Sequence, residues 1–239
     1  MDLFYIALIA VAGSFIQTSS GIGYAIVTMA LWPVFIPFRQ ASVLEVITAF
    51  AMVIYILVKL SGRINFKLLL FPLISSITCS TFGVFTLMAS TEAFMRRVLG
   101  VFLLILSAYF LFFNGKMKIK PTRTNGLIAG ALSGFFGGMF SIGGPPIVLY
   151  LVSATDDKME YSATLQCYYI CVSIYILAMH IILGNVTGET LKYSAVVIIG
   201  VLIGTGAGLN LFRKLSMNAI KRLVNGFMAV AGIYLTIKG

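Results

Sequence analysis

Long apolar runs separated by short polar stretches dominate the chain. Six of these runs are uninterrupted: residues 41–60, 66–89, 94–113, 161–183, 191–211 and 217–237. Each has about the 20 residues that a helix needs to cross a bilayer. None alternates between apolar and polar residues, as the strands of an outer-membrane barrel would. The pattern therefore predicts an all-α polytopic membrane protein.

Two further apolar stretches contain breaks. Residues 3–37 are interrupted at 19–23, and residues 125–153 are interrupted at 141–146. Gly costs about 1 kcal/mol and Pro about 3 kcal/mol inside a helix, and Pro146 disfavours the helical conformation of Pro145. In lipid, the backbone groups that a break exposes need partners in the protein or in a water-filled cavity. We expect the two breaks to face each other and to form a substrate site.

The two halves of the chain repeat each other. A shift of 121 residues places Gly13 on Gly134, Ser20 on Ser141, Gly23 on Gly144 and Glu45 on Gln166. This predicts two membrane repeats, residues 1–115 and 125–239, joined by a basic linker at 116–124. Each repeat has four hydrophobic segments, of which the first is broken. Breaks at equivalent places of two repeats are the best sequence indication of a transporter binding site.

The positive charges favour one topology. If both broken segments cross the membrane fully, nine Lys and Arg residues fall on one side and eight on the other. If both are re-entrant hairpins, the division becomes twelve against five. Cytoplasmic loops carry an excess of Lys and Arg. The sequence therefore predicts re-entrant segments, inverted repeats, a cytoplasmic linker and both termini outside.

Composition supports the membrane assignment and narrows the function. The chain is 60% hydrophobic and 10% charged, whereas soluble domains have about 25% charged residues. The formal net charge of +10 lies in short loops, so it indicates orientation, and we expect no nucleic-acid partner. Cys79, Cys167 and Cys171 lie in apolar runs without metal-type spacing and are interpreted as packing residues. Because the sequence contains no phosphate-binding loop and no nucleophile–base motif, we expect that the protein is not an enzyme and binds no metal or cofactor.

The breaks have the chemistry of an anion site. A helix that begins at a break presents free N–H groups and about half a positive charge; we expect such starts at Tyr24 and at Pro145 or Pro146. The predicted substrate-binding residues are Ser19, Ser20, Gly21, Gly23, Tyr24, Ser141, Gly143, Gly144 and Pro145, with Gln17 and Gln166 as secondary candidates. Two other sets of glycines are interpreted as helix-packing residues: Gly126, Gly130 and Gly134, and Gly200, Gly204 and Gly208.

Two ionisable residues within the apolar runs need separate consideration. Glu45 lies about one turn into its run, and a carboxylate inside the membrane is a functional candidate by default. Because burial favours the neutral acid, Glu45 is a candidate for carrying a coupling proton. The alternative is an interfacial position near Arg39. His180 lies near the end of its run and is expected at the interface.

The two broken motifs resemble those of a known family. The segment from Gly137 to Pro146, together with that from Ser20 to Gly23, is similar to the TauE/SafE family of sulfite exporter-like membrane transporters. The resemblance covers nearly the whole chain, although Tyr24 stands where a further glycine is common. It implies a secondary transporter of small sulfur-containing anions such as sulfite, a sulfonate or sulfoacetate. We also expect a multi-pass protein of the bacterial inner membrane. Its oligomeric state is left open, and a homo-oligomer is one of the options.

Two other functions remain open at this point. An anion channel could use the same breaks as a selectivity filter. A thiol carrier or membrane enzyme could act through Cys167 and Cys171, beside Gln166.

Overall fold

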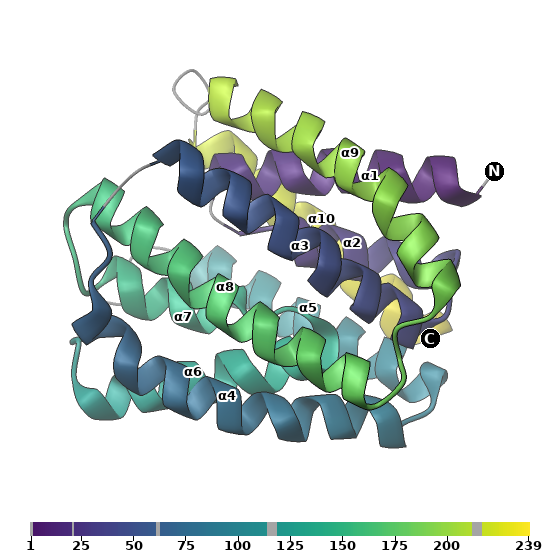
Figure 1. Cartoon of the computed structure of the whole chain (residues 1–239), viewed down its shortest axis with the longest axis horizontal. Coiled ribbons are helices and arrows are strands. Elements are labelled where there is room, and N and C mark those ends of the chain that lie inside the picture. The colour runs from purple at the N-terminus through teal and green to yellow at the C-terminus, as the bar shows by residue number, and fades with distance from the viewer. Residues whose placement is uncertain (1, 21, 61–62, 114–118, 212–216) are drawn as a thin grey trace.

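The computed structural model describes residues 2–20, 22–60, 63–113, 119–211 and 217–239. All regular structure within these ranges is helical, which confirms the predicted class (Figure 1). The helices are α1 (Asp2–Ser20), α2 (Tyr24–Leu31), the 3₁₀ helix η1 (Trp32–Val34), α3 (Phe38–Leu60), α4 (Phe66–Ala89), α5 (Glu92–Phe113), α6 (Arg123–Phe140), α7 (Gly144–Val152), α8 (Lys158–Ile182), α9 (Gly188–Leu211) and α10 (Met217–Lys238).

Five helices of the described chain, α3, α4, α5, α8 and α9, are long and apolar enough to cross a membrane. They correspond to five of the six uninterrupted runs. The sixth run forms α10, in which the described side chains continue as an apolar helix over Val224–Lys238. Large apolar side chains such as Phe66, Ile74 and Phe82 on α4 are more than half exposed. Such surfaces are suited to contact with lipid, so the molecule is a multi-pass integral membrane protein.

The helix is interrupted at both predicted breaks. α1 ends at Ser20 and α2 begins at Tyr24, while α6 ends at Phe140 and α7 begins at Gly144. α2 packs against α1, and α7 against α6. With eight and nine residues, α2 and α7 are only about 12–14 Å long. Neither can cross a hydrocarbon core of about 30 Å by itself.

Glycines allow two extensively packed helix pairs, α4 with α6 and α1 with α9, to approach closely. On α6, a Cβ added at Gly134 would lie 2.2 Å from the Ser76 carbonyl oxygen of α4. On α9, a Cβ added at Gly204 would lie 2.3 Å from the Val11 carbonyl oxygen of α1. Small residues allow this close approach of helix backbones in membranes. The predicted packing role of these glycines is therefore confirmed.

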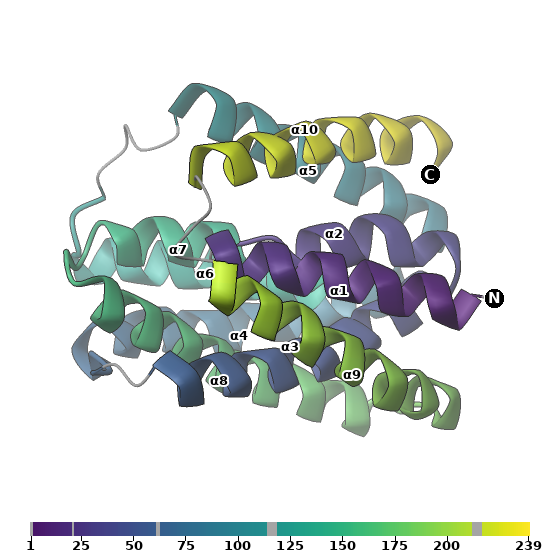
Figure 2. The same cartoon turned by 90° about the horizontal axis from the view of Figure 1, so that it is seen from above.

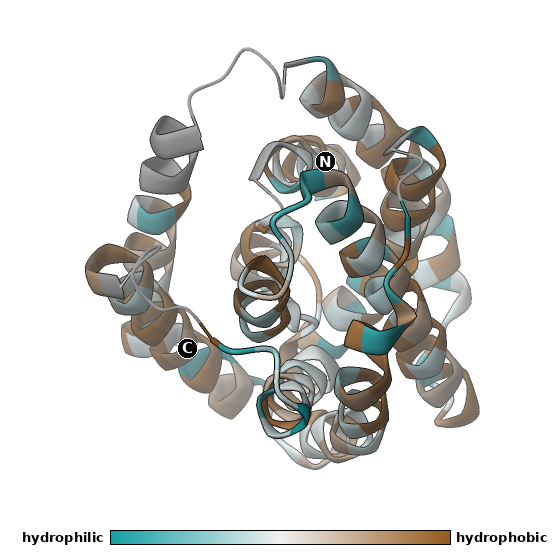
Figure 3. Ribbon diagram, turned by 90° about the vertical axis from the view of Figure 1, so that its left-hand side faces the viewer, coloured by the Kyte–Doolittle hydropathy of each residue, from teal (hydrophilic) through white to brown (hydrophobic). Residues whose placement is uncertain are grey.

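Most helix contacts join the first half of the chain to the second. α4 packs on α6, α1 on α9, α5 on α10 and α3 on α8. The two termini lie at the same end of the bundle, and α6 begins at the opposite end (Figures 1 and 2). α1 and α6 run in opposite directions, as do α5 and α10. Hydrophobic residues predominate along the middle of the outer helices, and hydrophilic residues gather at helix ends and connections (Figure 3).

Candidate functional site

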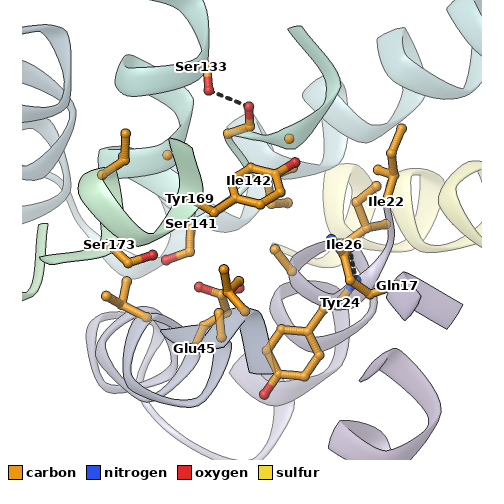
Figure 4. A pocket seen from close by; sticks show the side chains of 18 of the residues that line it. Gln17, Ile22, Tyr24, Ile26, Glu45, Ser133, Ser141, Ile142, Tyr169 and Ser173 are labelled. Atoms are coloured by element: carbon orange, nitrogen blue, oxygen red, sulfur yellow. Dashed lines mark hydrogen bonds between the residues drawn. The ribbon is translucent and has the colours of Figure 1, made fainter. Parts of the chain in front are cut away.

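A cavity of about 90 Å³ lies between the two breaks (Figure 4). Its walls come from both halves of the chain, namely from the α1–α2 and α6–α7 breaks and from the facing helices α3 and α8. Its polar and glycine lining consists of Gln17, Gly23, Tyr24, Glu45, Ser133, Gly137, Ser141, Gly143, Gly144, Tyr168, Tyr169 and Ser173, with Pro145 beside them. Isoleucine, valine, alanine and methionine side chains complete the wall.

Gln17 ties together the two limbs of the first break. Its Oε1 accepts a hydrogen bond from the Tyr24 N–H at 3.1 Å. The chain can turn here because Gly23 has a φ of 144°, which L-residues rarely adopt. The Tyr24 hydroxyl is 2.5 Å from the Thr48 hydroxyl of α3, so this phenol points away from the centre of the cavity (Figure 4).

Hydroxyl groups fix the second break. Ser133 donates to the Gly143 carbonyl oxygen at 2.5 Å and accepts from the Tyr168 hydroxyl at 2.9 Å. Ser141 has left-handed backbone angles, with φ 61°. Its hydroxyl is 2.9 Å from the Ser42 hydroxyl of α3. The break is thus held from α6, α8 and α3 together.

The helix starts offer fewer N–H donors than the sequence suggests. α7 begins at Gly144, so Pro145 and Pro146, which have no N–H, occupy its first turn. In α2, the Tyr24 N–H already serves Gln17. The first-turn donors left to a ligand are those of Ala25 and Ile26 in α2 and Gly144 in α7.

Glu45 and Tyr169 supply the remaining chemistry. Glu45 is 4% exposed and faces the cavity, and its carboxyl interacts with the Ser141 hydroxyl (Figure 4). Tyr169 projects from α8 over the start of α7, with its hydroxyl 2.9 Å from the place of a Cβ on Gly144. Both groups therefore lie where a ligand at the second break would contact them.

The comparison with known families agrees with this architecture. The family model described as sulfite exporter TauE/SafE matches residues 5–235. The chain belongs to the TauE/SafE family. TauE/SafE proteins are membrane transporters of sulfite-type anions and not enzymes. No curated protein and no solved structure matches the chain.

Several residues predicted for this TauE/SafE protein line the cavity, and others do not. Those that line it are Gln17, Gly23, Tyr24, Glu45, Ser141, Gly143, Gly144 and Pro145. Gln166 lies outside the lining, buried in α8 at 5% exposure. The side chains of Ser19 and Ser20 and the whole of Gly21 lie outside the described residues.

His180, for which the sequence predicts an interfacial position, lies in the last turn of α8 in this TauE/SafE protein. It is fully buried at the end of α8, and its Nδ1 is 3.1 Å from the Asn185 side-chain amide. Cys167 and Cys171 are half-buried and are absent from the cavity lining. Among the described residues, no group of His, Cys, Asp and Glu could hold a metal ion.

The sequence did not reveal the contributions of Ser133, Tyr168, Tyr169 and Ser173. Tyr168, Tyr169 and Ser173 lie inside α8, away from the glycine and proline signals, and Ser133 lies in α6 beside a glycine interpreted as a packing residue. One signal was present for Tyr169: the repeat shift of 121 places it on Thr48, which bonds Tyr24 beside the first break.

Proposed function

We propose that the chain is a secondary transporter that carries a small sulfur-containing anion, such as sulfite, a sulfonate or sulfoacetate, through the cavity between the breaks. Family membership supports the class of substrate. The observation that carries the site is that both breaks line one cavity. Its volume of about 90 Å³ is far below the roughly 300–1,000 Å³ of sites for drug-sized ligands. A small ion suits this space.

The proposed ligands of the anion are neutral. N–H groups at the starts of α2 and α7, the Ser141 hydroxyl and the Tyr169 hydroxyl can donate to anion oxygens. No Lys, Arg or His is among the described residues that line the cavity. An anion held by dipoles and neutral hydrogen bonds is bound moderately and released readily, which suits a carrier.

We also infer that residues 1–115 and 125–239 form inverted repeats with two re-entrant hairpins in the bacterial inner membrane. Three observations support this arrangement. α2 and α7 are too short to cross the membrane and pack on the helices that precede them. Corresponding helices run in opposite directions (Figures 1 and 2). In the proposed repeats, α1 corresponds to α6 and α4 to α9. The α1–α9 contact therefore has the α6–α4 contact as its counterpart, and both are present.

Flux in proteoliposomes tests the function. With a panel of labelled sulfite and sulfonates, we expect saturable uptake that is accelerated by the same anion on the other side of the membrane. Such acceleration requires a carrier, because a channel does not couple the two fluxes. Gly144→Leu should abolish uptake, since its side chain meets Tyr169 in the cavity. Gly226→Leu on α10, where a Cβ has nothing within 4 Å, is the control.

The result can reject either part of the proposal. Conductive flux without acceleration by the opposite anion would favour the channel alternative. Normal uptake by Gly144→Leu would place the substrate elsewhere.

A further inference from the structure

The cavity proposed for the anion also contains a carboxyl group. Glu45 is the one acidic side chain among the described lining residues, and it is 4% exposed. No basic side chain in the described lining is available to balance a second negative charge. An anion in a space of about 90 Å³ would lie within a few ångströms of this group. Two like charges this close, and shielded from water, disfavour each other strongly.

Apart from Glu45 itself, no charged side chain is among the described residues that line the cavity. Tyr24 of α2, Tyr169 of α8 and Ser141 of the second break face Glu45. The helices α5 and α9 also pack on α3, but their charged residues are absent from that lining. These residues are Glu92, Arg96 and Arg97 on α5, and Glu189 and Lys192 on α9. Protonation is therefore the available means of removing the charge of Glu45.

A proton on Glu45 changes the site in two ways. It removes the repulsion, and it converts the carboxylate from a pure acceptor into a group with one O–H donor. The cavity has few other donors, because Pro145 and Pro146 have no N–H and the Tyr24 N–H is bonded to Gln17. The O–H of a protonated Glu45 adds one. The protonated cavity is thus neutral and richer in donors, whereas the deprotonated cavity repels anions.

We propose that the anion and one proton bind this cavity together, with the proton on the Glu45 carboxyl, so that both move in the same direction. This rests on the anion site proposed above. The balance is simple: carboxylate, proton and anion combine to a carboxylic acid beside the anion, and release on the other side reverses the step. For a singly charged anion, the cycle moves no net charge. Exchange of the anion against a proton would require Glu45 to be charged while the anion is bound, which the geometry opposes.

Binding to the purified protein tests the coupling. Methanesulfonate is the probe, because its single charge does not change between about pH 5 and 9. Above the pH at which Glu45 loses its proton, wild-type affinity should fall about tenfold per pH unit, as expected for one linked proton. Glu45→Gln should bind at all these pH values with one constant affinity. Glu189→Gln, which alters a carboxylate outside the cavity, should behave as the wild type.

Accumulation in proteoliposomes gives the direction. With a pH gradient and no membrane potential, the wild-type protein should concentrate methanesulfonate in the alkaline compartment, and Glu45→Gln should only equilibrate it. Accumulation in the acidic compartment would show exchange and overturn the proposal. So would wild-type binding that is independent of pH, or loss of all binding by a Glu45→Gln protein with an unchanged melting temperature. Absence of wild-type sulfonate and sulfite binding at every pH would instead reject the anion site itself.

Discussion

Replacing Gly23 by alanine tests whether the first break needs its unusual backbone. Gly23 precedes α2 with φ 144° and ψ −25°, a conformation that costs other residues about 1–3 kcal/mol. The new Cβ would also lie 2.6 Å from Cγ2 of Ile16, whereas carbon atoms pack at about 3.5–4.0 Å. Forcing an extra methyl group into packed surroundings costs about 1–3 kcal/mol. We expect Gly23→Ala to destabilise the protein by about 2–6 kcal/mol in total.

Thermal unfolding of the purified protein measures this loss. For a chain of this size, 1 kcal/mol corresponds to roughly 2–4 °C, so the melting temperature should fall by roughly 4–24 °C. Ile16→Ala separates the two causes. It removes Cγ2 and leaves Cβ of residue 16 at 3.6 Å, an ordinary contact. In that background, Gly23→Ala should cost about 1–3 kcal/mol less, because only the backbone strain remains.

The control is Gly226→Ala on α10, where the new Cβ meets nothing within 4 Å. Alanine is the better helix former by about 1 kcal/mol, so this variant should melt at the wild-type temperature or above it. A Gly23→Ala protein that melts at the wild-type temperature would refute the argument from the backbone of the break. Equal costs of Gly23→Ala with and without Ile16→Ala would refute the steric part alone.

Three further predictions concern the site, the packing and the topology. Tyr169→Phe should weaken methanesulfonate binding at most about tenfold, since it removes one neutral hydrogen bond. Tyr175→Phe is the control and should leave binding unchanged, because the Tyr175 hydroxyl bonds Thr81 outside the cavity. Equal affinities of both variants would exclude Tyr169 as a ligand. Gly134→Ala should lower the melting temperature, because its Cβ would lie 2.2 Å from the Ser76 oxygen, whereas Gly137→Ala, with 3.6 Å to its nearest neighbour, should be tolerated. Accessibility reporters in the linker 116–124 and after the last residue should label from opposite sides of the membrane, and labelling from one side would contradict inverted repeats.

Local chemistry explains which parts of the structure could be predicted. Gly and Pro act on the backbone of their own neighbourhood, so the interruptions before Tyr24 and Gly144 were visible in the sequence. The apolar runs likewise predict the long helices by length alone. Because α7 begins at Gly144, its first turn contains two prolines, which have no N–H to donate. That detail depends on knowing the first residue of the helix to within one position, which a sequence pattern does not resolve.

Positions within the long helices were harder to assign. α8 is apolar on most of its surface, so no polar stripe indicates that Tyr169 faces a cavity and Gln166 does not. Which face of a helix meets a cavity depends on the packing of distant segments, here α3 against α8. Glu45 could be recognised as a candidate because carboxylates are rare in the membrane. Its place beside Ser141 required the fold.

The pairing of helices across the two halves has a consequence for biosynthesis. α1 is made first, but the groove that receives it is formed by α9, and α4 similarly awaits α6. At about 5–20 residues per second, ribosomes need on the order of ten seconds to reach α9 after completing α1. During that interval the glycine-lined contact of α1 does not exist, and its side chains are surrounded by lipid or by the insertion machinery. Neither half can therefore mature alone, and the last helices to leave the ribosome complete the packing of the first.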